Sequence, residues 1–586
     1  MAEYLSPGVY VEEVESGSKS IEGVSTSTAG FIGLATRGKV RGTPELVTSF
    51  AEYQRKFGGF LSESLYGEYR YLPYSVYQFF QNGGSRCYVM RVAPPDAKAA
   101  SRESGNKKLL ISAKDPGSWG NNMVVTFAKS SRSKTQILEE QPKENKYILK
   151  SVAGFGVGDT IVFSDGKRLL YNKVVKIVGN AIITEKAFEP GVADTNLIAA
   201  KTISTCEINV QVDYDGAVEK YEFVNLNELS SSFIEKRLGK SGLVAVKFNG
   251  GGNKPDEKAG AVGGIRSIMQ VLFEEDLERA VLTLGGGSDG SISKIDPSVF
   301  MGEDKGPSNR TGLQAFLENN IVSILAIPGI TEPSVAVSLV AHCANMGNRM
   351  AILDAPKDVV RVDELLQHRS IIDSSYAAMY HPWIQTYDVL DKRQVSIPPS
   401  GAIAGIYARS DVQRGVHKAP ANENVSCTGL SCFYNKGEQD ILNPAGVNLI
   451  RSFPGQGFKV WGARTCSVDA SFKYINVRRL FIFIEESIKV NTTWAVFEPN
   501  NETLWAQVER TIANFLTTVW RAGALAGTTP AEAFFVDVSR NTMSPDDIAN
   551  GRLICTVGIA PTKPAEFVIF RITQMVEGAG GESSAE

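Results

Sequence analysis

The sequence predicts a multidomain protein of α/β and α+β domains, with an inserted, mostly β domain and an extended strand-forming arm at each end. Three observations lead to this fold class. The chain has 586 residues, more than one typical domain, and its 43% hydrophobic and 21% charged residues are typical of a folded globular protein. Two regions alternate helix and strand patterns. Between them lies a long stretch of short strands with glycine turns.

The N-terminal segment LSPGVYVEEV contains a strand that has no neighbouring strand in the sequence. Val9, Tyr10 and Val11 are good strand formers directly behind a Pro-Gly turn. The small polar residues of SGSKSIEG follow, and they give the chain flexibility. We therefore assign residues 1–25 to an arm and linker, and the strand at residues 9–14 needs a sheet elsewhere to pair with.

The first α/β region opens with the strand AGFIGLATRG. Two segments with aromatic residues at helical spacing follow, and the strand SRCYVMRV completes a β-α-α-β unit. The α/β pattern returns at RAVLTLGGGSDGS, after which RTGLQAFLENN reads as a helix. IVSILAIPG, EPSVAVSLVAHCANMG and NRMAILDAP then read as a right-handed β-α-β unit with two parallel strands. We assign residues 26–94 and 279–396 to one discontinuous α/β domain.

The stretch between these two parts consists of short alternating strands. In CEINVQVDYDGAVEKYEFVNL, apolar and polar residues alternate on both sides of an Asp-Gly turn, which indicates an antiparallel hairpin. The sequence therefore predicts an inserted, mostly β domain at residues 95–278.

The region of residues 397–565 is predicted to be an α+β domain. Its longest helix covers residues 502–522, where Asn500 or Asn501 can cap the first turn. Two strands follow, LICTVGIAP and AEFVIFRITQM, and the second belongs to a C-terminal arm and tail at residues 566–586. One apolar stripe of the helix is formed by Trp505, Val508, Ile512, Phe515, Leu516 and Val519.

Charge and targeting signals exclude several classes of function. The net charge of -3 gives no global basic footprint, so we expect no nucleic-acid partner. The N-terminus has no basic and apolar signal pattern, and no window approaches about 18 uninterrupted apolar residues, so we expect neither secretion by a leader nor membrane insertion. We interpret the seven cysteines as reduced thiols of a protein made in the cytosol.

One motif offers a catalytic alternative. GGGSDG has the form G-x-S-x-G of a hydrolase nucleophile elbow around Ser288, and Asp354 with His368 or His381 follows in the matching order. That fold needs a helix immediately behind the serine, whereas Pro297 and a lack of helical periodicity follow here. We prefer a glycine-rich turn and keep an esterase-like hydrolase that uses Ser288 as the alternative function.

Two further motifs are weaker. LGKS lies between a helix and a strand, the reverse of the order that a phosphate-binding loop requires. Cys427 and Cys432, with His417 nearby, offer fewer ligands than the four of a closed zinc site. The sequence therefore predicts a protein that is not an enzyme and has no cofactor and no metal site.

Many segments of the C-terminal third closely resemble contractile tail sheath proteins. They include PPSGAIAGIYARSDVQRGVHKAPAN, GVNLIRSFPGQGFKVWGARTCS, YINVRRLFIFIEESI, FEPNNETLW, WRAGALAGTTPAEAFFV and NGRLICTVGIAPTKPAEFVIFRI. LSPGVYVEEV, LGGGSDG and SSYAAMYHPWI are similar to segments of the same family. The resemblance extends over residues 1–93 and 280–575. The family includes the sheaths of phages, of phage-tail-like bacteriocins and of extracellular contractile injection systems.

The resemblance implies a structural subunit that polymerises helically around an inner tube in an extended, metastable state. Contraction of such a sheath drives the tube through a target cell envelope. The implied partners are other copies of the chain in hexameric rings, the inner tube protein, baseplate and terminal cap proteins, and paralogous sheath subunits. The resemblance also implies assembly in a bacterial cytoplasm and an outer position for the inserted domain.

In this family, the terminal strands of each subunit complete a sheet in the C-terminal domain of other subunits. The resemblance also implies that the C-terminal domain faces the tube, and we select Glu509, Arg510 and Arg521 on the polar face of the 502–522 helix as candidate tube contacts. The residues predicted for the inter-subunit strands are Val9, Tyr10, Val11, Glu12, Val14, Phe567, Val568, Ile569, Phe570 and Ile572.

Overall fold

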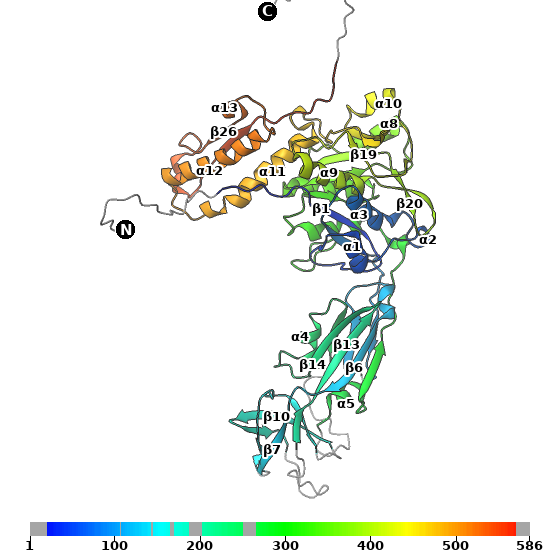
Figure 1. Ribbon diagram of the computed structural model, residues 1–586, viewed down its shortest axis with the longest axis vertical. Coiled ribbons are helices and arrows are strands. Elements are labelled where there is room, and N and C mark those ends of the chain that lie inside the picture. The colour runs from blue at the N-terminus through cyan, green and yellow to red at the C-terminus, as the bar shows by residue number, and fades with distance from the viewer. Residues whose placement is uncertain are drawn as a thin grey trace, which may run out of the picture.

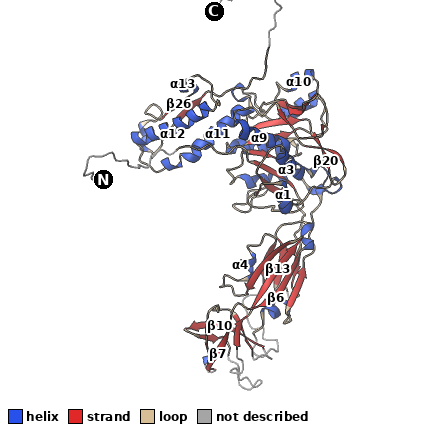
Figure 2. Cartoon of the chain, viewed as in Figure 1, coloured by secondary structure: helices blue, strands red, loops and turns tan. Residues whose placement is uncertain are grey.

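The chain folds into a part that mixes helices and strands and a long β-rich arm that extends from it (Figures 1 and 2). This computed structural model describes residues 20–105, 107–141, 144–164, 169–186, 202–249 and 265–569. The mixture of α/β and mostly β regions agrees with the predicted fold class. Within these residues, no helix has the length and apolar content to span a membrane. The domain boundaries given above stay predictions.

A nine-stranded sheet of order β2-β3-β1-β17-β18-β19-β24-β25-β22 forms the centre of the mixed part. The six strands from β3 to β24 are parallel, and antiparallel strands lie at both edges. The central strands are almost wholly buried, as expected for parallel strands covered on both faces. The strands are β1 (Ala29–Leu34), β2 (Glu45–Val47), β3 (Cys87–Val92), β17 (Ile324–Ala326), β18 (Met350–Asp354), β19 (Ala377–His381), β22 (Glu423–Asn424), β24 (Val447–Phe453) and β25 (Gly457–Val460).

Helices cover both faces of this sheet and create a hydrophobic core on each side. One core contains buried residues of α1 (Phe50–Phe57), α3 (Tyr71–Gln81) and α9 (Ser400–Arg414). The other contains those of α7 (Pro333–Met346), α8 (Val362–Arg369) and α10 (Lys436–Leu442). The predicted β-α-α-β and parallel β-α-β units are confirmed. Smaller elements here are α2 (Glu63–Tyr66), α6 (Pro297–Met301), β20 (Ile384–Asp388), β21 (Arg393–Ile397) and β23 (Gly429–Leu430).

The helix predicted for RTGLQAFLENN is wrong. Its residues form only a short 3-10 helix, Gly312–Phe316. Gly312 has a φ of +51°, and a Cβ there would lie 2.6 Å from the carbonyl oxygen of Phe300. The glycine allows a left-handed turn in close contact with another loop, and this tertiary contact overrides the local helical pattern.

Two glycines of α9 allow it to pack directly on the backbone of α3. A Cβ on Gly401 would lie 2.3 Å from the carbonyl oxygen of Ser75, and one on Gly405 would lie 2.4 Å from that of Phe79. Because larger residues would separate the helices, the GAIAG segment fixes α9 against the core. The same helix carries Asp411, whose position is therefore fixed as well.

A buried carboxylate lies at the carboxyl end of β18. Asp354 accepts hydrogen bonds from the Ser400 backbone N–H and hydroxyl at 2.9 and 2.7 Å and from the Gly329 N–H at 3.0 Å. Burial nevertheless raises the pKa of Asp354 from an ordinary 3.8 to about 6. The folded state therefore binds this proton more tightly than the unfolded state, so the contribution of Asp354 to stability falls as pH rises through this range.

The variant Asp354→Asn should remove that pH dependence, because an amide does not titrate. We expect the unfolding free energy of the wild type, relative to Asp354→Asn, to increase by up to about 3 kcal/mol between about pH 7 and about pH 4. Urea denaturation of both proteins across this range measures the difference. A difference that stays constant with pH would contradict the raised pKa.

The β-rich arm consists of two sheets and a closed barrel, with antiparallel pairing throughout the described strands. The β16 strand pairs with β6, so residues beyond 278 take part in the four-stranded sheet. That sheet contains β14 (Ala217–Val224), β13 (Glu207–Tyr214), β6 (Val124–Ser130) and β16 (Arg279–Thr283). The three-stranded sheet and two helices are β15 (Val244–Phe248), β5 (Leu109–Ala113), β4 (Ser101–Glu103), α4 (Ile234–Leu238) and α5 (Ile268–Phe273).

The barrel lies at the end of the β-rich arm that is farthest from the nine-stranded sheet (Figure 1). It has its own small hydrophobic core, which includes Tyr147, Phe163 and Ile203. Its strands are β7 (Lys134–Gln141), β8 (Lys146–Leu149), β9 (Thr160–Ser164), β10 (Leu169–Val178), β11 (Ala181–Thr184) and β12 (Thr202–Thr205).

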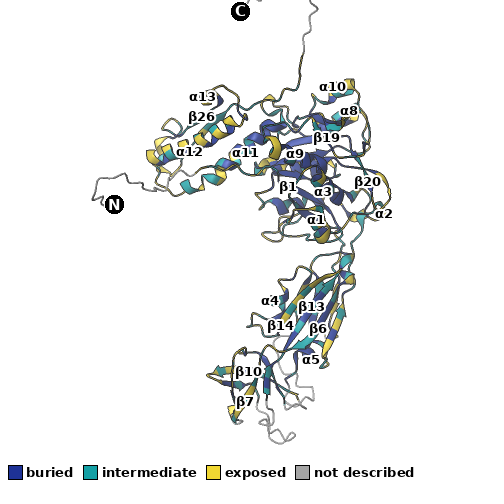
Figure 3. Ribbon diagram, viewed as in Figure 1, coloured by how far each residue is buried: buried dark blue, intermediate teal, exposed yellow. Residues whose placement is uncertain are grey.

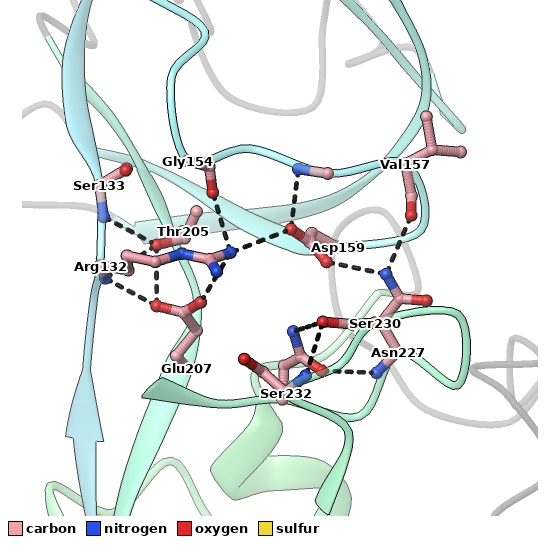
Figure 4. Close-up of polar contacts among 12 residues, drawn as sticks. Arg132, Ser133, Gly154, Val157, Asp159, Thr205, Glu207, Asn227, Ser230 and Ser232 are labelled. Carbon is pink, nitrogen blue, oxygen red and sulfur yellow. Dashed lines mark hydrogen bonds and ion pairs between the residues drawn. The ribbon is translucent and has the colours of Figure 1, made fainter. Parts of the chain in front are cut away.

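A polar network holds the barrel against the four-stranded sheet (Figure 4). Arg132, between β6 and β7, forms ion pairs with buried Glu207 at 3.2 Å and buried Asp159 at 3.7 Å. Asn227, in the loop after β14, donates from its side chain to Asp159 at 2.8 Å and to the Val157 carbonyl at 2.9 Å. These contacts connect the chain between β6 and β7 with the barrel loop before β9 and with the loop after β14. They therefore restrict bending between the barrel and the four-stranded sheet.

Helices α11 (Ile475–Asn491) and α12 (Glu502–Arg521) form a further lobe. Asn501 caps α12 by accepting from the Leu504 N–H at 3.0 Å, and the predicted apolar stripe is buried. The opposite face of α12 is exposed (Figure 3). This confirms the longest helix predicted from the sequence. Smaller elements of the lobe are β26 (Phe534–Asp537), β27 (Thr556–Ile559), α13 (Pro530–Ala533) and α14 (Pro545–Ala549).

Candidate functional site

The described part of the predicted N-terminal linker lies along α11. The Val24 N–H donates to the Ser487 hydroxyl at 3.1 Å, and the Asn491 side chain donates to the Glu22 carbonyl at 2.9 Å. The expectation of a flexible linker through residue 25 is therefore wrong for residues 20–25. Gly23 allows the segment to approach α11 closely, because a Cβ there would lie 2.7 Å from the Phe483 ring.

A buried ion pair fastens the next residues of this segment. Arg479 of α11 binds Asp411 of α9 through two hydrogen bonds of 2.8 and 2.6 Å, and both side chains are almost fully buried. Thr26 joins the pair twice: its hydroxyl donates to Asp411 at 2.6 Å, and its carbonyl accepts from Arg479 at 2.9 Å. Each charge has a partner of opposite sign, which the burial of both requires.

A second arginine fastens the C-terminal segment. Arg464 donates two parallel hydrogen bonds of 2.8 Å to the Glu566 carboxylate, which also accepts from the Tyr474 hydroxyl at 2.9 Å and the Asn443 amide at 2.7 Å. Burial alone would raise the pKa of Glu566, but these hydrogen bonds outweigh burial and hold that pKa below its ordinary value. The carboxylate is therefore charged and firmly held at neutral pH.

The three residues after this fastening are exposed. Phe567, Val568 and Ile569 have exposed fractions of 73%, 70% and 80%, and they are not part of a strand within this single chain. Three consecutive large apolar side chains that all face water are unusual on the surface of a folded chain. The other residues of the two predicted arm strands lie outside the described residues: Val9, Tyr10, Val11, Glu12, Val14, Phe570 and Ile572.

The lobe also contains a small sheet that has open edges. In the described part of the chain, β26 pairs only with β27, as an antiparallel pair of four residues each. One face packs on α12 through residues such as Val536 and Val557. On the other face, the half-exposed Phe535 ring covers Gly558, where a Cβ would lie 2.1 Å away. A two-stranded sheet is weak by itself, and its unpaired edges are suitable for additional strands.

The residues of the catalytic alternative are engaged elsewhere. The Ser288 hydroxyl accepts from the Gly290 N–H at 3.2 Å, Asp354 binds Ser400, and the His381 imidazole lies 2.9 Å from the Tyr434 hydroxyl. The esterase hypothesis therefore has no support. A short helix does begin at Pro297, nine residues beyond the serine rather than directly behind it.

The cysteine motif does not form a closed cluster either. Cys432 lies 3.6 Å from the Nε2 atom of His381, whereas the carbonyl of His417 accepts from Asn476 of α11. Among the residues that the structure describes, no group of three or more His, Cys, Asp and Glu side chains could hold a metal ion.

Two family models match the chain one after the other. The phage tail sheath protein central domain matches residues 305–466, which include Arg464 and Asp411. The phage tail sheath C-terminal domain matches residues 467–575, which include Arg479, Glu566 and the β26–β27 sheet.

The chain belongs to the phage tail sheath family.

Two curated relatives of this sheath protein share about a quarter of the aligned residues with it. It is 24% identical to a prophage major tail sheath protein of Pseudomonas aeruginosa (strain UCBPP-PA14), over 54% of this chain and 82% of that protein. It is 26% identical to the tail sheath protein of Escherichia phage P2, over 42% of this chain and 65% of that protein. Its fold is similar to that of the PVC sheath complex of an extracellular contractile injection system in the contracted state, with a TM-score of 0.50, 20% identity and coverage of 98% and 99%.

The sequence of the sheath protein did not predict the ion pairs Arg479–Asp411 and Arg464–Glu566. Arg464, Asp411 and Arg479 lie in segments that carry the family resemblance, but their roles depend on contacts with residues far away in the chain. One signal was present: INVRRLFIFI places two arginines at the start of an apolar helix, where a buried partner is expected.

The candidate tube contacts Glu509, Arg510 and Arg521 are on the exposed face of α12.

Proposed function

We propose that this protein is the structural subunit of a contractile tail sheath, which polymerises helically around an inner tube in an extended, metastable state and contracts to drive the tube through a target cell envelope. The observation that carries the proposal is the combination of a fastened C-terminal segment, exposed strand formers directly after it, and a two-stranded sheet with open edges. Each is of little use to an isolated monomer, and together they suit connection between identical subunits.

The proposed connection adds two arms to one acceptor sheet. Residues 9–14 of one copy and residues 567–572 of another pair with the open edges of β26 and β27 in a third copy. About five ladder hydrogen bonds at a net ~0.5–1.5 kcal/mol each give a few kcal/mol per arm, to which side-chain burial adds. One arm is weak, but each subunit donates two and receives two, so the lattice is held by multivalency.

Further partners follow from this role. The exposed face of α12, with Glu509, Arg510 and Arg521, is the proposed contact with the inner tube, and the β-rich arm is the proposed outer part of the sheath. Baseplate proteins, a terminal cap and paralogous sheath subunits would bind the ends or replace single copies. Assembly would take place in a bacterial cytoplasm, and the product would be part of a phage tail or a phage-tail-like particle.

Electron microscopy tests the proposal directly. The purified protein, alone and mixed with its tube protein, is examined by negative stain, and the expected result is helical tubes of uniform diameter. The same preparation is assayed with a generic ester, and Ser288→Ala serves as the control. A monomer that forms no tubes, and whose ester hydrolysis is lost with Ser288→Ala, would contradict a structural role and restore the enzymatic one.

A further inference from the structure

One helix, α11, contacts both terminal segments. At its start, the Tyr474 hydroxyl donates to Glu566 at 2.9 Å, and Asn476 donates to the Thr562 carbonyl at 3.4 Å. The rest of α11 holds the N-terminal segment, beginning with the hydrogen bond from Arg479 to the Thr26 carbonyl at 2.9 Å. The first turn of α11 therefore binds the C-terminal segment, and the turns that follow, from Arg479 onward, bind the N-terminal segment.

The N-terminal contacts follow a regular stripe on α11. Four residues face this segment: Arg479, Phe483, Ser487 and Asn491. They are four positions apart, and such residues lie on one side of a helix. The segment therefore runs along α11, from the last turn toward the first, before it enters β1. Seventeen residues at about 1.5 Å each make α11 about 25 Å long, so the contacts span most of its length.

The fastened end of α11 is tied to the central sheet. Arg464, which binds Glu566, is held by two backbone hydrogen bonds of 2.8 and 2.7 Å with the Asn448 side chain of β24. Arg478 lies over the Phe472 ring at 3.5 Å, and Arg479 is paired with Asp411 of α9. Because β24 and α9 belong to the packed core, the start of α11 cannot move independently of it.

We infer that α11 transmits tension between the two terminal arms of each subunit. It fixes the points at which the N-terminal and C-terminal arms leave the fold, so that a pull on one arm passes through α11 to the other instead of peeling the segments off. Glu566, Arg464, Arg479 and Asp411 are the positioning residues of this link. The inference rests on the proposed function, because load arises only when the arms are bound to other copies.

Two variants loosen the link at opposite ends. Glu566→Ala removes the carboxylate that holds the C-terminal segment. Gly23→Leu places a side chain where even a Cβ would lie 2.7 Å from Phe483, so it lifts the N-terminal segment from α11. Glu318→Ala is the matched control, because it breaks an ion pair with Arg310, whose described side-chain partners, Asp304 and Glu318, lie outside both segments.

Hydrogen exchange of the full-length subunit tests each fastening without any assembly. In Glu566→Ala, the backbone amide of Thr562, which donates to the Ala524 carbonyl at 3.1 Å, should exchange at least tenfold faster than in the wild type. In Gly23→Leu, the backbone amide of Val24, which donates to the Ser487 hydroxyl, should do so, and Glu318→Ala should leave both amides unchanged. Equal exchange in the wild type and in both variants would show that the segments are not fastened as inferred, whether or not sheaths form.

Contraction of assembled sheaths tests the load. Extended sheaths of the wild type and the three variants are exposed briefly to mild denaturant, and intact contracted sheaths are counted by electron microscopy. We expect at least a tenfold lower count for Glu566→Ala and Gly23→Leu, with fragments and free subunits instead, and a count for Glu318→Ala equal to that of the wild type. If the variants show faster exchange but their sheaths still contract intact, α11 does not transmit tension between the arms. Failure of the wild type to assemble at all would instead refute the proposed function.

Discussion

Deletion of residues 1–14 should leave the subunit folded but lower the yield of sheaths by at least tenfold. The deletion removes one of the two donated strands, and with it about half of the inter-subunit ladder hydrogen bonds, each worth a net ~0.5–1.5 kcal/mol. In a lattice held by multivalency, such a loss is multiplied over all subunits. Circular dichroism and thermal unfolding report the fold, and sedimentation with negative-stain microscopy reports the assembly.

The matched control removes residues 577–586 from the other end. This deletion leaves residues 567–572 in place and takes away only the glycine-rich and acidic tail, so sheath yield should stay within about twofold of the wild type. If the 1–14 deletion still gives sheaths that contract normally, the arm is dispensable and the proposed connection is wrong.

Asp411→Ala should cause the largest loss of stability of any single substitution discussed. It leaves the Arg479 guanidinium buried without its counter-ion, and the Arg479 side chain has only 3% exposure. Removal of one partner of a buried ion pair lowers the free energy of unfolding by about 3–5 kcal/mol. Thr26 also loses the acceptor of its hydroxyl. Urea denaturation followed by tryptophan fluorescence measures the effect, because Trp505 and Trp520 lie in the adjoining lobe.

Two comparisons separate this effect from an ordinary loss of contacts. Glu502→Ala breaks an ion pair with Arg540 whose partners are 74% and 77% exposed, and it should cost at most about 1 kcal/mol. The double variant Asp411→Leu with Arg479→Met removes both charges and should be less destabilised than Asp411→Ala. If Asp411→Ala and Glu502→Ala lower the free energy of unfolding by the same amount, burial of the Asp411–Arg479 pair does not increase the loss.

The sequence predicts best where a local pattern agrees with the tertiary contacts. The helix of residues 502–521 has a cap at Asn501 and an apolar stripe, and α12 buries that same stripe. The parallel strands β17 and β18 are continuous apolar runs, and burial on both faces requires such runs. In these cases one pattern determines both the element and its surroundings.

The rest depends on residues that are far apart in the chain. Residues 310–320 have a helical pattern, but close contact at Gly312 prevents the helix. Residues 20–25 have the composition of a flexible linker, but they are bound by a stripe on α11 more than 450 positions away. Glu566 appears in the sequence as one residue of a strand, and only the fold brings Arg464, Tyr474 and Asn443 to it.

Electron cryomicroscopy of the sheath in the extended and contracted states would show directly whether the terminal arms connect the subunits. In both states we expect β26 and β27 to be flanked by two additional strands, residues 9–14 and residues 567–572, each from a different copy of the chain. The described residues already provide an acceptor with two open edges for such strands. A map in which either arm pairs within its own chain, or in which the edges of β26 and β27 are unpaired in either state, would contradict this expectation.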